Sequence, residues 1–183
     1  LDLSQNTALQ GLVCYSNQLI SLDVSQNTAL EYLDCRSNQL TSLDVSQNTA
    51  LSYLDCSYNQ LTGLDLSHNV DLITLKFHAN QLTCLNVANG NNIGLDFLFM
   101  QSDFFNNYNL TCIEVDDAEW STDNWTNISP SWYFSEDCNN DCTASLTELS
   151  TSRNLIQILD MMGRETSFKP NTPLIYVYDD GSI

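Results

Sequence analysis

The nine-residue stretch "LDVSQNTAL" occupies residues 22–30 and returns letter for letter at residues 43–51. Close copies, "LDLSQNTAL" and "LDLSHNVDL", occupy residues 1–9 and 64–72, so each copy begins 21 residues after the one before it. Self-similarity at a fixed period of roughly 20 to 50 residues is typical of repeat architectures. The chain is therefore predicted to be an array of stacked units and not a single irregular core.

The second half of each period indicates how one unit folds. Its pattern is L-x-x-L-x-C-x-x-N-x-L, in which apolar residues alternate with variable ones. Its copies are "LQGLVCYSNQL" (9–19), "LEYLDCRSNQL" (30–40), "LSYLDCSYNQL" (51–61) and the more divergent "LITLKFHANQL" (72–82). Because successive side chains point to opposite faces of a strand, Leu33 and Cys35 are predicted to point inward and Asp34 outward.

The first half of the period, L-x-x-L-x-V-x-x-N, has the same design. Each 21-residue coil is therefore predicted to hold two short strands joined by turns that contain Asn, with successive coils about 4.8 Å apart. Buried Asn amides at such bends bind backbone groups, and buried free Cys residues act as small packing side chains. The predicted scaffold columns are Asn17, Asn38, Asn59 and Asn80; Asn6, Asn27, Asn48 and Asn69; and Cys14, Cys35 and Cys56.

The repeat "LTSLDVSQNTALSYLDCSYNQ" (40–60) resembles the leucine-rich repeats of surface proteins from Bacteroidetes and is similar to the cysteine-ladder repeats of the listerial internalins. The resemblance covers residues 1 to about 115. It implies a leucine-rich-repeat solenoid that acts as a non-catalytic binding surface for protein or glycan, with no cofactor. Residue 1 already lies inside a repeat, so we expect the array to be incomplete at its N-terminus.

The copies differ mainly on one side of the array. The SQNTA segment scarcely varies, whereas the outward positions of the L-x-C half change from copy to copy. Arg36 and Lys76, the only Lys or Arg residues before residue 142, fall among these positions together with four tyrosines. Tyr and Arg are frequent anchors in binding interfaces. The predicted ligand-binding face consists of Tyr15, Tyr32, Asp34, Arg36, Tyr53, Asp55, Tyr58, Lys76 and His78.

Two simpler interpretations stay open for these outward positions. Strands favour aromatic residues even without a ligand, so the tyrosines are also compatible with an ordinary solvent-facing surface. The aspartates would form like-charge columns, with Asp23, Asp44 and Asp65 on one side and Asp34 and Asp55 on the other, at a cost in stability unless solvent or a cation screens them. A calcium site needs about six convergent oxygens, so a solvated acidic face is the preferred interpretation.

Composition limits the classes of function. The 183 residues include 23 acidic residues and 5 Lys or Arg residues, which gives a net charge of -18. This charge disfavours nucleic acid and anionic membranes as partners. No apolar run approaches the roughly 18 residues of a spanning helix. No Walker loop, HExxH motif, GxSxG motif or Cys–His pair is present, so no catalytic site, metal site or cofactor is predicted.

After residue 84 the period breaks, because "LTCLNV" (82–87) returns as "LTCIEV" (110–115) after 28 residues. The segment that follows, residues 116–142, contains all three tryptophans: Trp120, Trp125 and Trp132. We predict that this segment caps the solenoid, because a repeat array must cover its terminal core. An exposed tryptophan platform for carbohydrate is the alternative.

Four cysteines lie outside the Cys column, at Cys84, Cys112, Cys138 and Cys142. Cys112 and Cys138 bracket the cap, so a disulfide between them would staple the cap to the array in an oxidising compartment. The sequence does not fix the pairing. A zinc site is the competing interpretation, although no His lies near these cysteines.

From residue 143 onward there is no repeat. Alternating apolar segments at 155–161 and 174–178 predict strands of a small β-sandwich-like unit. The stretches "NLIQILDMMGRET" and "PLIYVYDDGSI" resemble the C-terminal sorting domain of Bacteroidetes type IX secretion substrates. The resemblance implies recognition by the type IX translocon and sorting machinery through Asp160, Gly163, Arg164, Glu165, Tyr176, Tyr178, Asp180 and Gly181.

The C-terminal segment departs from that family in two ways. It lacks the Asn-Pro-Asn segment common near the start of the sorting domain, and it stops at Ile183, where a final basic and apolar strand is expected. The sorting domain would therefore be incomplete at its C-terminus. A small β-unit that merely ends the molecule is the alternative.

Together these features predict a mainly β protein with three parts: a leucine-rich-repeat array at 1–115, a tryptophan-containing cap at 116–142 and a sorting domain at 143–183. The predicted function is that of a secreted, non-enzymatic binding or adhesion protein at the outer-membrane surface of a Gram-negative bacterium, with an unidentified protein or glycan ligand. A carbohydrate-binding protein for polysaccharide capture is the second interpretation. A structural spacer with no saturable ligand is the third.

Overall fold

The structure is a computed structural model of the whole chain, and it forms two compact units, Leu1–Ser145 and Leu146–Ile183. The residues described below are 1–95, 107–126, 128–139 and 142, together with the backbone of 155–160 and 174–178. Each unit is considered by itself.

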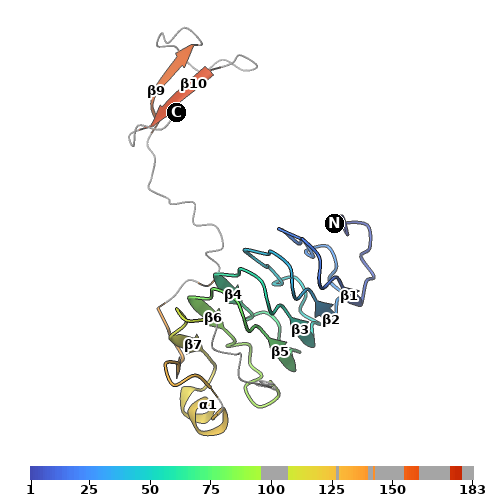
Figure 1. Cartoon of the computed structure of the whole chain (residues 1–183), viewed down its shortest axis with the longest axis vertical. Coiled ribbons are helices and arrows are strands. Elements are labelled where there is room, and N and C mark those ends of the chain that lie inside the picture. The colour runs from blue at the N-terminus through green and yellow to red at the C-terminus, as the bar shows by residue number, and fades with distance from the viewer. Residues whose placement is uncertain (96–106, 127, 140–141, 143–154, 161–173, 179–183) are drawn as a thin grey trace. The chain divides into compact units, whose positions relative to one another are not determined.

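The first unit is a solenoid of stacked coils, and one side of it is a parallel sheet, here called sheet A (Figure 1). Its strands are β1 (Gly11–Val13), β2 (Tyr32–Asp34), β3 (Tyr53–Asp55) and β5 (Thr74–Lys76), in that order. Leu12, Leu33, Leu54 and Leu75 are paired in register across the sheet. The 21-residue sequence period is thus the register of the sheet, and the predicted leucine-rich-repeat solenoid is confirmed.

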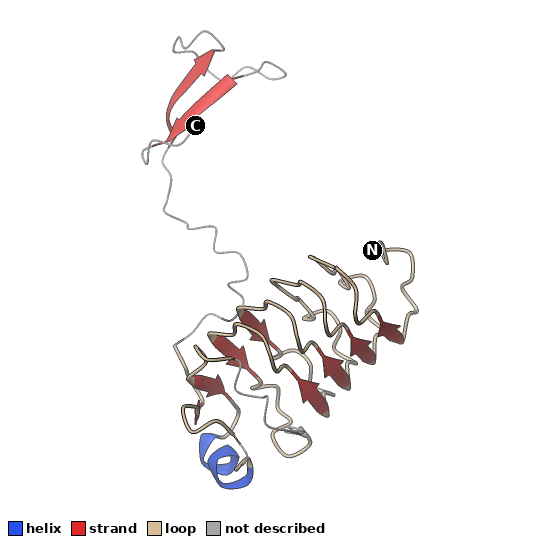
Figure 2. Ribbon diagram, viewed as in Figure 1, coloured by secondary structure: helices blue, strands red, loops and turns tan. Residues whose placement is uncertain are grey.

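A second parallel sheet, sheet B, forms only in the later coils (Figure 2). Its strands are β4 (Gly63–Asp65), β6 (Cys84–Asn86), β7 (Cys112–Glu114) and β8 (Tyr133–Ser135). The prediction of a second strand in every coil is wrong for residues 22–24 and 43–45, which are not strands. The apolar side chains of both segments are nevertheless buried. Alternation in the sequence reports which side chains are buried, and it does not report whether the backbone is paired.

The core consists of leucine columns that run along the solenoid axis. Leu33, Leu54 and Leu64 are completely buried, and Cys35 and Cys56 lie between the leucines of their coils. The three cysteines of the predicted packing column are free and buried. Burial raises the pKa of the Cys35 and Cys56 thiols, because an apolar interior disfavours the charged thiolate. These thiols are therefore packing groups, which agrees with the sequence-based interpretation.

The first Asn column binds each coil to its predecessor. The Asn59 Nδ2 group donates hydrogen bonds to Cys35 O at 3.1 Å and to Cys56 O at 3.0 Å, and Asn59 Oδ1 accepts one from the backbone N–H of Leu40 at 3.0 Å. Asn38 and Asn80 repeat this arrangement one coil before and one coil after. Each carbonyl of the column is therefore shared by the amides of two successive coils, and the backbone N–H of Leu40 is satisfied by Asn59 Oδ1.

The same column continues beyond the last regular repeat. Asn107 Nδ2 donates to Phe77 O at 3.2 Å, and its Oδ1 accepts from the backbone N–H of Leu82 at 3.0 Å. Asn107 was not predicted to belong to the column, because it follows Asn80 by 27 residues instead of 21. The coil is longer, but its amide occupies the same structural position.

The second Asn column has a different pattern. Asn48 Nδ2 donates to Val24 O at 3.0 Å and to Asn27 O at 2.8 Å, and Asn69 repeats both bonds one coil later. The Oδ1 atoms of Asn27, Asn48 and Asn69 are buried and have no hydrogen-bond partner among the described residues. Each amide of this column therefore contributes donors only.

The last coil is closed by aromatic side chains. The helix α1 (Ala118–Asn124) begins at its N-cap Asp117, whose carboxylate accepts the backbone N–H of Trp120 at 2.8 Å. Trp125 packs against Phe134 with ring centroids 5.4 Å apart, and Trp125 and Trp132 are buried. These two rings cover the end of the core. The alternative of an exposed tryptophan platform for carbohydrate is therefore wrong for Trp125 and Trp132.

Two disulfides fix the cap to the array. One joins Cys112 to Cys138, the pair considered from the sequence, and the other joins Cys84 to Cys142. Both start from sheet B, because Cys84 and Cys112 begin β6 and β7. The Cys142 backbone oxygen approaches within 3.0 Å of where a Cβ at Gly63 would lie, so a larger residue at position 63 would collide with this crossing.

The second unit contains the antiparallel pair β9 (Leu155–Asp160) and β10 (Leu174–Tyr178), close to the two strands predicted from the sequence. Asp160 pairs with Leu174, and Tyr176 pairs with Ile158. The other expected sorting residues, Gly163, Arg164, Glu165, Asp180 and Gly181, lie outside the described residues. Among the described residues, no helix is both long and apolar enough to cross a membrane.

Asn59→Ala is expected to lower the free energy of unfolding by about 2 kcal/mol, because it leaves the buried backbone N–H of Leu40 unpaired and removes one of the two donors to Cys35 O and to Cys56 O. Asn17→Ala is the matched control. Asn17 is exposed and bonds only to carbonyls of its own coil, so its loss should cost less than about 1 kcal/mol. Urea unfolding followed by circular dichroism measures both values. Equal losses in the two variants would contradict the proposed role of the column.

Candidate ligand-binding face

The outward side chains of sheet A and of the residues that follow its strands form one continuous surface, which we call the tyrosine face. The tyrosine face follows from the register of sheet A, because residues 21 apart in the first coils are neighbours on adjacent strands. The structure brings together all nine residues predicted from the sequence and adds Ser57. The tyrosine face is Tyr15, Tyr32, Asp34, Arg36, Tyr53, Asp55, Ser57, Tyr58, Lys76 and His78.

Two tyrosines of this face are stacked on each other. Tyr32 and Tyr53 are register partners, and their rings lie 4.3 Å apart with an interplanar angle of 10°. Lys76 Nζ donates to Tyr53 Oη at 3.0 Å, and this hydrogen bond is the main reason that the pKa of Lys76 is raised. Burial, and then the neighbouring Tyr53, raise the pKa of Tyr32. The Tyr32 phenol therefore remains a neutral donor and acceptor at ordinary pH.

The aspartates of the face are not solvated, which corrects the sequence-based expectation. Asp34 is 3% exposed and Asp55 is 2% exposed, although both point away from the core. Arg36 lies between them, with Nε 3.7 Å from Asp34 Oδ1 and Nη1 3.5 Å from Asp55 Oδ2. The backbone N–H groups of Arg36 and Ser57 donate to the Oδ1 atoms of Asp34 and Asp55 at 3.3 Å and 3.1 Å. The two carboxylates thus share one cation, and each accepts a backbone N–H from its own coil.

Arg36 also links this acidic pair to the aromatic side chains. Its guanidinium carbon lies 4.6 Å from the centroid of the Tyr15 ring, within the range of a cation–π contact. Desolvation lowers the pKa of Arg36, but the nearby Asp34 and Asp55 carboxylates outweigh it and raise the pKa overall. The cation is therefore held in place by two carboxylates and one ring.

The other edge of the face is formed by Ser57, Tyr58 and His78. Ser57 Oγ lies 2.9 Å from His78 Nδ1, and the Tyr58 and His78 rings meet edge to face at 4.9 Å. Ser57 was not predicted as part of this face, although its 21-residue spacing from both Arg36 and His78 places it in their column. Ser57 is fully buried, so its hydroxyl supports His78 and cannot reach a substrate.

Tyr58 occupies an unusual backbone position. Ser16, Ser37, Tyr58 and Ala79 follow the strands of sheet A, and all have positive φ angles between 52° and 56°. A left-handed conformation costs roughly 1 kcal/mol in a residue other than Gly. Small residues occupy this bend in three of the coils, whereas Tyr58 places a half-exposed ring on the face there.

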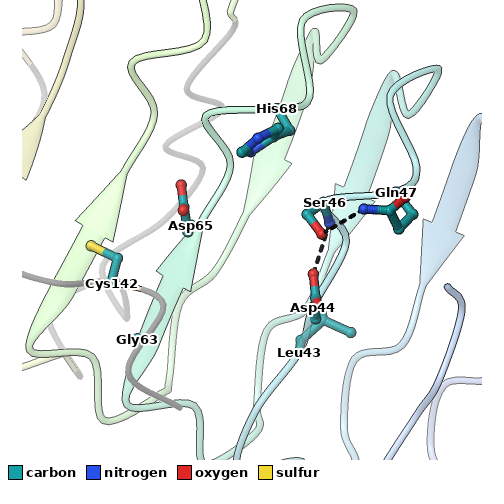
Figure 3. Close-up of a pocket in the computed structure, with 8 residues that line it drawn as sticks. All are labelled: Leu43, Asp44, Ser46, Gln47, Gly63, Asp65, His68 and Cys142. Carbon is teal, nitrogen blue, oxygen red and sulfur yellow. Dashed lines mark hydrogen bonds between the residues drawn. The ribbon is translucent and has the colours of Figure 1, made fainter. Parts of the chain in front are cut away.

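The described surface also has shallow grooves on other parts of the coils. One, of about 300 Å³, is lined by polar groups that include Asp44, Ser46, Asp65 and His68 (Figure 3). A similar groove of about 240 Å³ lies near Asp2 and Asp23, so the feature recurs along the array. Asp44 accepts the backbone N–H of Ser46 at 2.9 Å. Hydrogen bonds from Ser4 and Ser25 lower the pKa of the exposed Asp2 and Asp23.

These aspartates are exposed or half-exposed, as the sequence analysis expected for Asp23, Asp44 and Asp65. Each uses one carboxylate oxygen to accept the backbone N–H two residues later. Within the part of the chain that the structure describes, no group of three or more His, Cys, Asp or Glu residues is arranged to hold a metal ion.

Comparison with solved structures finds similar chains among the listerial internalins. The functional domain of InlJ from Listeria monocytogenes, described as including a cysteine ladder, is 35% identical over 63% of this chain and 28% of that chain, with a TM-score of 0.49. An internalin, inlF, from Listeria monocytogenes strain 4b F2365 is 21% identical over 62% of this chain and 30% of its own, with a TM-score of 0.43. The chain thus spans less than a third of these structures. No family model and no curated protein matches it.

Arg36→Met is expected to lower the free energy of unfolding by about 1 kcal/mol, because it removes the cation between two buried carboxylates while retaining the length of the side chain. The loss should be larger at low ionic strength, where like charges are screened less. Adding Asp55→Asn to Arg36→Met should recover part of it. Urea unfolding of the four members of this double-mutant cycle, at low and high salt, measures the coupling; a coupling of zero would contradict the ion pair.

Proposed function

We propose that this protein is a non-enzymatic binding or adhesion protein whose tyrosine face contacts a protein ligand at a cell surface. The proposal rests on one observation: four tyrosines and two cations lie together on the sheet A side of the array. The scaffold residues, in contrast, repeat from coil to coil. Large side chains with polar tips give much contact area at a low entropic cost, which is why Tyr and Arg dominate interface energetics.

The internal contacts of the face support this proposal. Stacking of Tyr32 on Tyr53, and pairing of Arg36 with Asp34 and Asp55, hold these side chains in place before any ligand arrives. A pre-ordered surface loses less conformational entropy on binding. The array supplies the rigidity, because the Asn column anchors each coil next to the strands that carry the face.

Polysaccharide capture is the competing proposal, and the ring contacts argue against it. Carbohydrates commonly stack on the open faces of aromatic rings. Tyr32 and Tyr53 cover one face of each other, and the guanidinium of Arg36 covers the ring of Tyr15. Apart from the face of Tyr32 on the Gly11 side, these three tyrosines therefore offer mostly edges and hydroxyl groups, which suit a protein surface better than a sugar ring.

The C-terminal residues are proposed to act as the export address. The resemblance of residues 155–165 and 174–182 to a type IX sorting domain supports this assignment, and β9 and β10 form the hairpin-like pair that these residues would require. Recognition by the type IX translocon would place the protein at the outer-membrane surface of a Gram-negative bacterium. The two disulfides of the first unit are compatible with such an oxidising location.

Replacing Tyr32 and Tyr53 together by Ala is expected to weaken ligand binding at least about tenfold, since interface tyrosines contribute more than about 1 kcal/mol each. The unfolding free energy should fall by only about 1 kcal/mol, because both rings are partly exposed and lose mainly their stacking contact. Peptides selected from a displayed random library on the 1–183 protein, and a glycan array, provide the two classes of probe.

Tyr133→Ala is the matched control, because this tyrosine is strongly exposed and lies on β8 of sheet B, not on sheet A. This change should not affect the selected peptides. Saturable glycan binding that is lost in the Tyr32→Ala/Tyr53→Ala variant would favour polysaccharide capture instead. The absence of any saturable ligand would favour a structural spacer.

The intact mass of the protein from the surface of the producing cell is expected to correspond to a chain that ends near residues 142–145, at the boundary between the two units. Removal of the address after export is the reason for this expectation. Variants that lack residues 146–183 should remain inside the cell envelope. A surface-exposed protein that still carries the complete second unit would contradict a cleaved sorting signal and make that unit part of the working molecule.

A further inference from the structure

The stack of tyrosines on sheet A ends where it meets a glycine. Gly11 is the register partner of Tyr32, just as Tyr32 is the register partner of Tyr53. The residue at this position of β1 therefore has no side chain to lie against the second face of the Tyr32 ring. A Cβ placed on Gly11 would meet only the Tyr32 Cβ, at an ordinary contact distance of 4.0 Å, so the space above Gly11 is open.

The side chains around this opening have distinct chemical characters. Val13, on the same strand, is 59% exposed and provides an apolar wall. The residues that precede Gly11 and Tyr32 in the chain add a polar pair, in which Gln10 Nε2 donates to the exposed carboxylate of Glu31, with Oε1 3.2 Å away. We call this opening the Gly11 notch: it lies over Gly11 beside Tyr32, and Val13 and the Gln10–Glu31 pair are the neighbouring side chains along the two chain segments.

We propose that the Gly11 notch receives an aromatic side chain from a protein partner, that this ring stacks on Tyr32, and that a basic residue next to it in the partner pairs with Glu31. The proposal rests on the proposed protein-binding function and specifies the chemistry of the ligand. In the complex, the partner ring would extend the Tyr53–Tyr32 stack by one member.

The geometry of the existing stack favours a flat ring as the occupant. Tyr32 and Tyr53 show that rings on adjacent strands of this sheet lie 4.3 Å apart, which is close to the strand spacing. A ring above Gly11 would meet Tyr32 at the same separation. A branched aliphatic side chain would fill the space less completely and would lack the favourable aromatic contact.

Charge favours a basic neighbour for that ring. Both Lys or Arg side chains of the first unit already have partners within the protein. Arg36 pairs with Asp34 and Asp55. Lys76 donates a hydrogen bond to the Tyr53 hydroxyl. Glu31 has a hydrogen bond from Gln10 and no ion pair among the described residues. The whole chain has a net charge of -18, so a cationic partner would be attracted to it before contact.

The test uses the capped tripeptides Lys-Tyr-Lys and Lys-Leu-Lys as probes of the 1–183 protein, with amide chemical shifts as the readout. Lys-Tyr-Lys should produce saturable shifts at Gly11, Glu31 and Tyr32. Lys-Leu-Lys should bind about three- to tenfold more weakly, the range expected for one aromatic pair. Glu31→Gln should weaken Lys-Tyr-Lys binding about threefold and reduce its dependence on salt.

Gly11→Tyr is the decisive variant, because its own ring would occupy the notch and compete with the peptide. Gly11→Ala is the matched control, since a methyl group is accommodated at that position. Gly11→Tyr should abolish the shifts, and Gly11→Ala should retain them. Unchanged amide shifts for β3 and β5 would show that both variants are folded.

The proposal is overturned if Lys-Tyr-Lys binds Gly11→Tyr as well as it binds the unmodified protein, or if the tyrosine and leucine peptides bind equally. The peptides selected from the displayed library separate this failure from failure of the proposed function. Peptides that need Tyr32 and Tyr53 but tolerate Gly11→Tyr would leave the binding function intact and eliminate the notch. Peptides that need neither would eliminate both.

Discussion

Each coil of this protein depends on one buried amide that binds two coils at once. Asn59 satisfies carbonyls of Cys35 and Cys56 and the N–H of Leu40, and equivalent Asn residues repeat the arrangement along the array. The leucine columns supply the apolar burial, but burial alone would allow one coil to slide along another. The amides fix the register, because a shift would leave their buried hydrogen-bonding groups without partners.

Fixed register has a direct consequence for the outer surface. Residues that share a repeat position become cross-strand neighbours, so tyrosines stack on tyrosines and Arg36 reaches the carboxylates of two coils. The outward positions do not contribute to the leucine core. They are therefore free to vary without loss of the fold, and the tyrosine face is built from them.

The ends of the array require different solutions from its middle. A regular coil is covered by the next one, whereas the last coil is covered by Trp125 and Trp132 and is fastened by two disulfides. Sheet B appears in these later coils and carries Cys84 and Cys112. The disulfides of the cap thus start from sheet B, whereas the tyrosine face lies on sheet A.

The sequence by itself determined the repeat period, the inward leucine, cysteine and asparagine columns, and nine of the ten residues of the tyrosine face, because each follows from side-chain direction and a constant spacing. Tertiary structure alone decided that Asp34 and Asp55 are buried and that residues 22–24 and 43–45 do not form strands. It also decided that Asn107 and Ser57 belong to existing columns. The disulfide between Cys84 and Cys142 was likewise set by the fold. Tertiary structure also decided that the space above Gly11 is open. The physical reason is that a repeat pattern states which way a side chain points, whereas its exposure and partners depend on neighbours contributed by other coils.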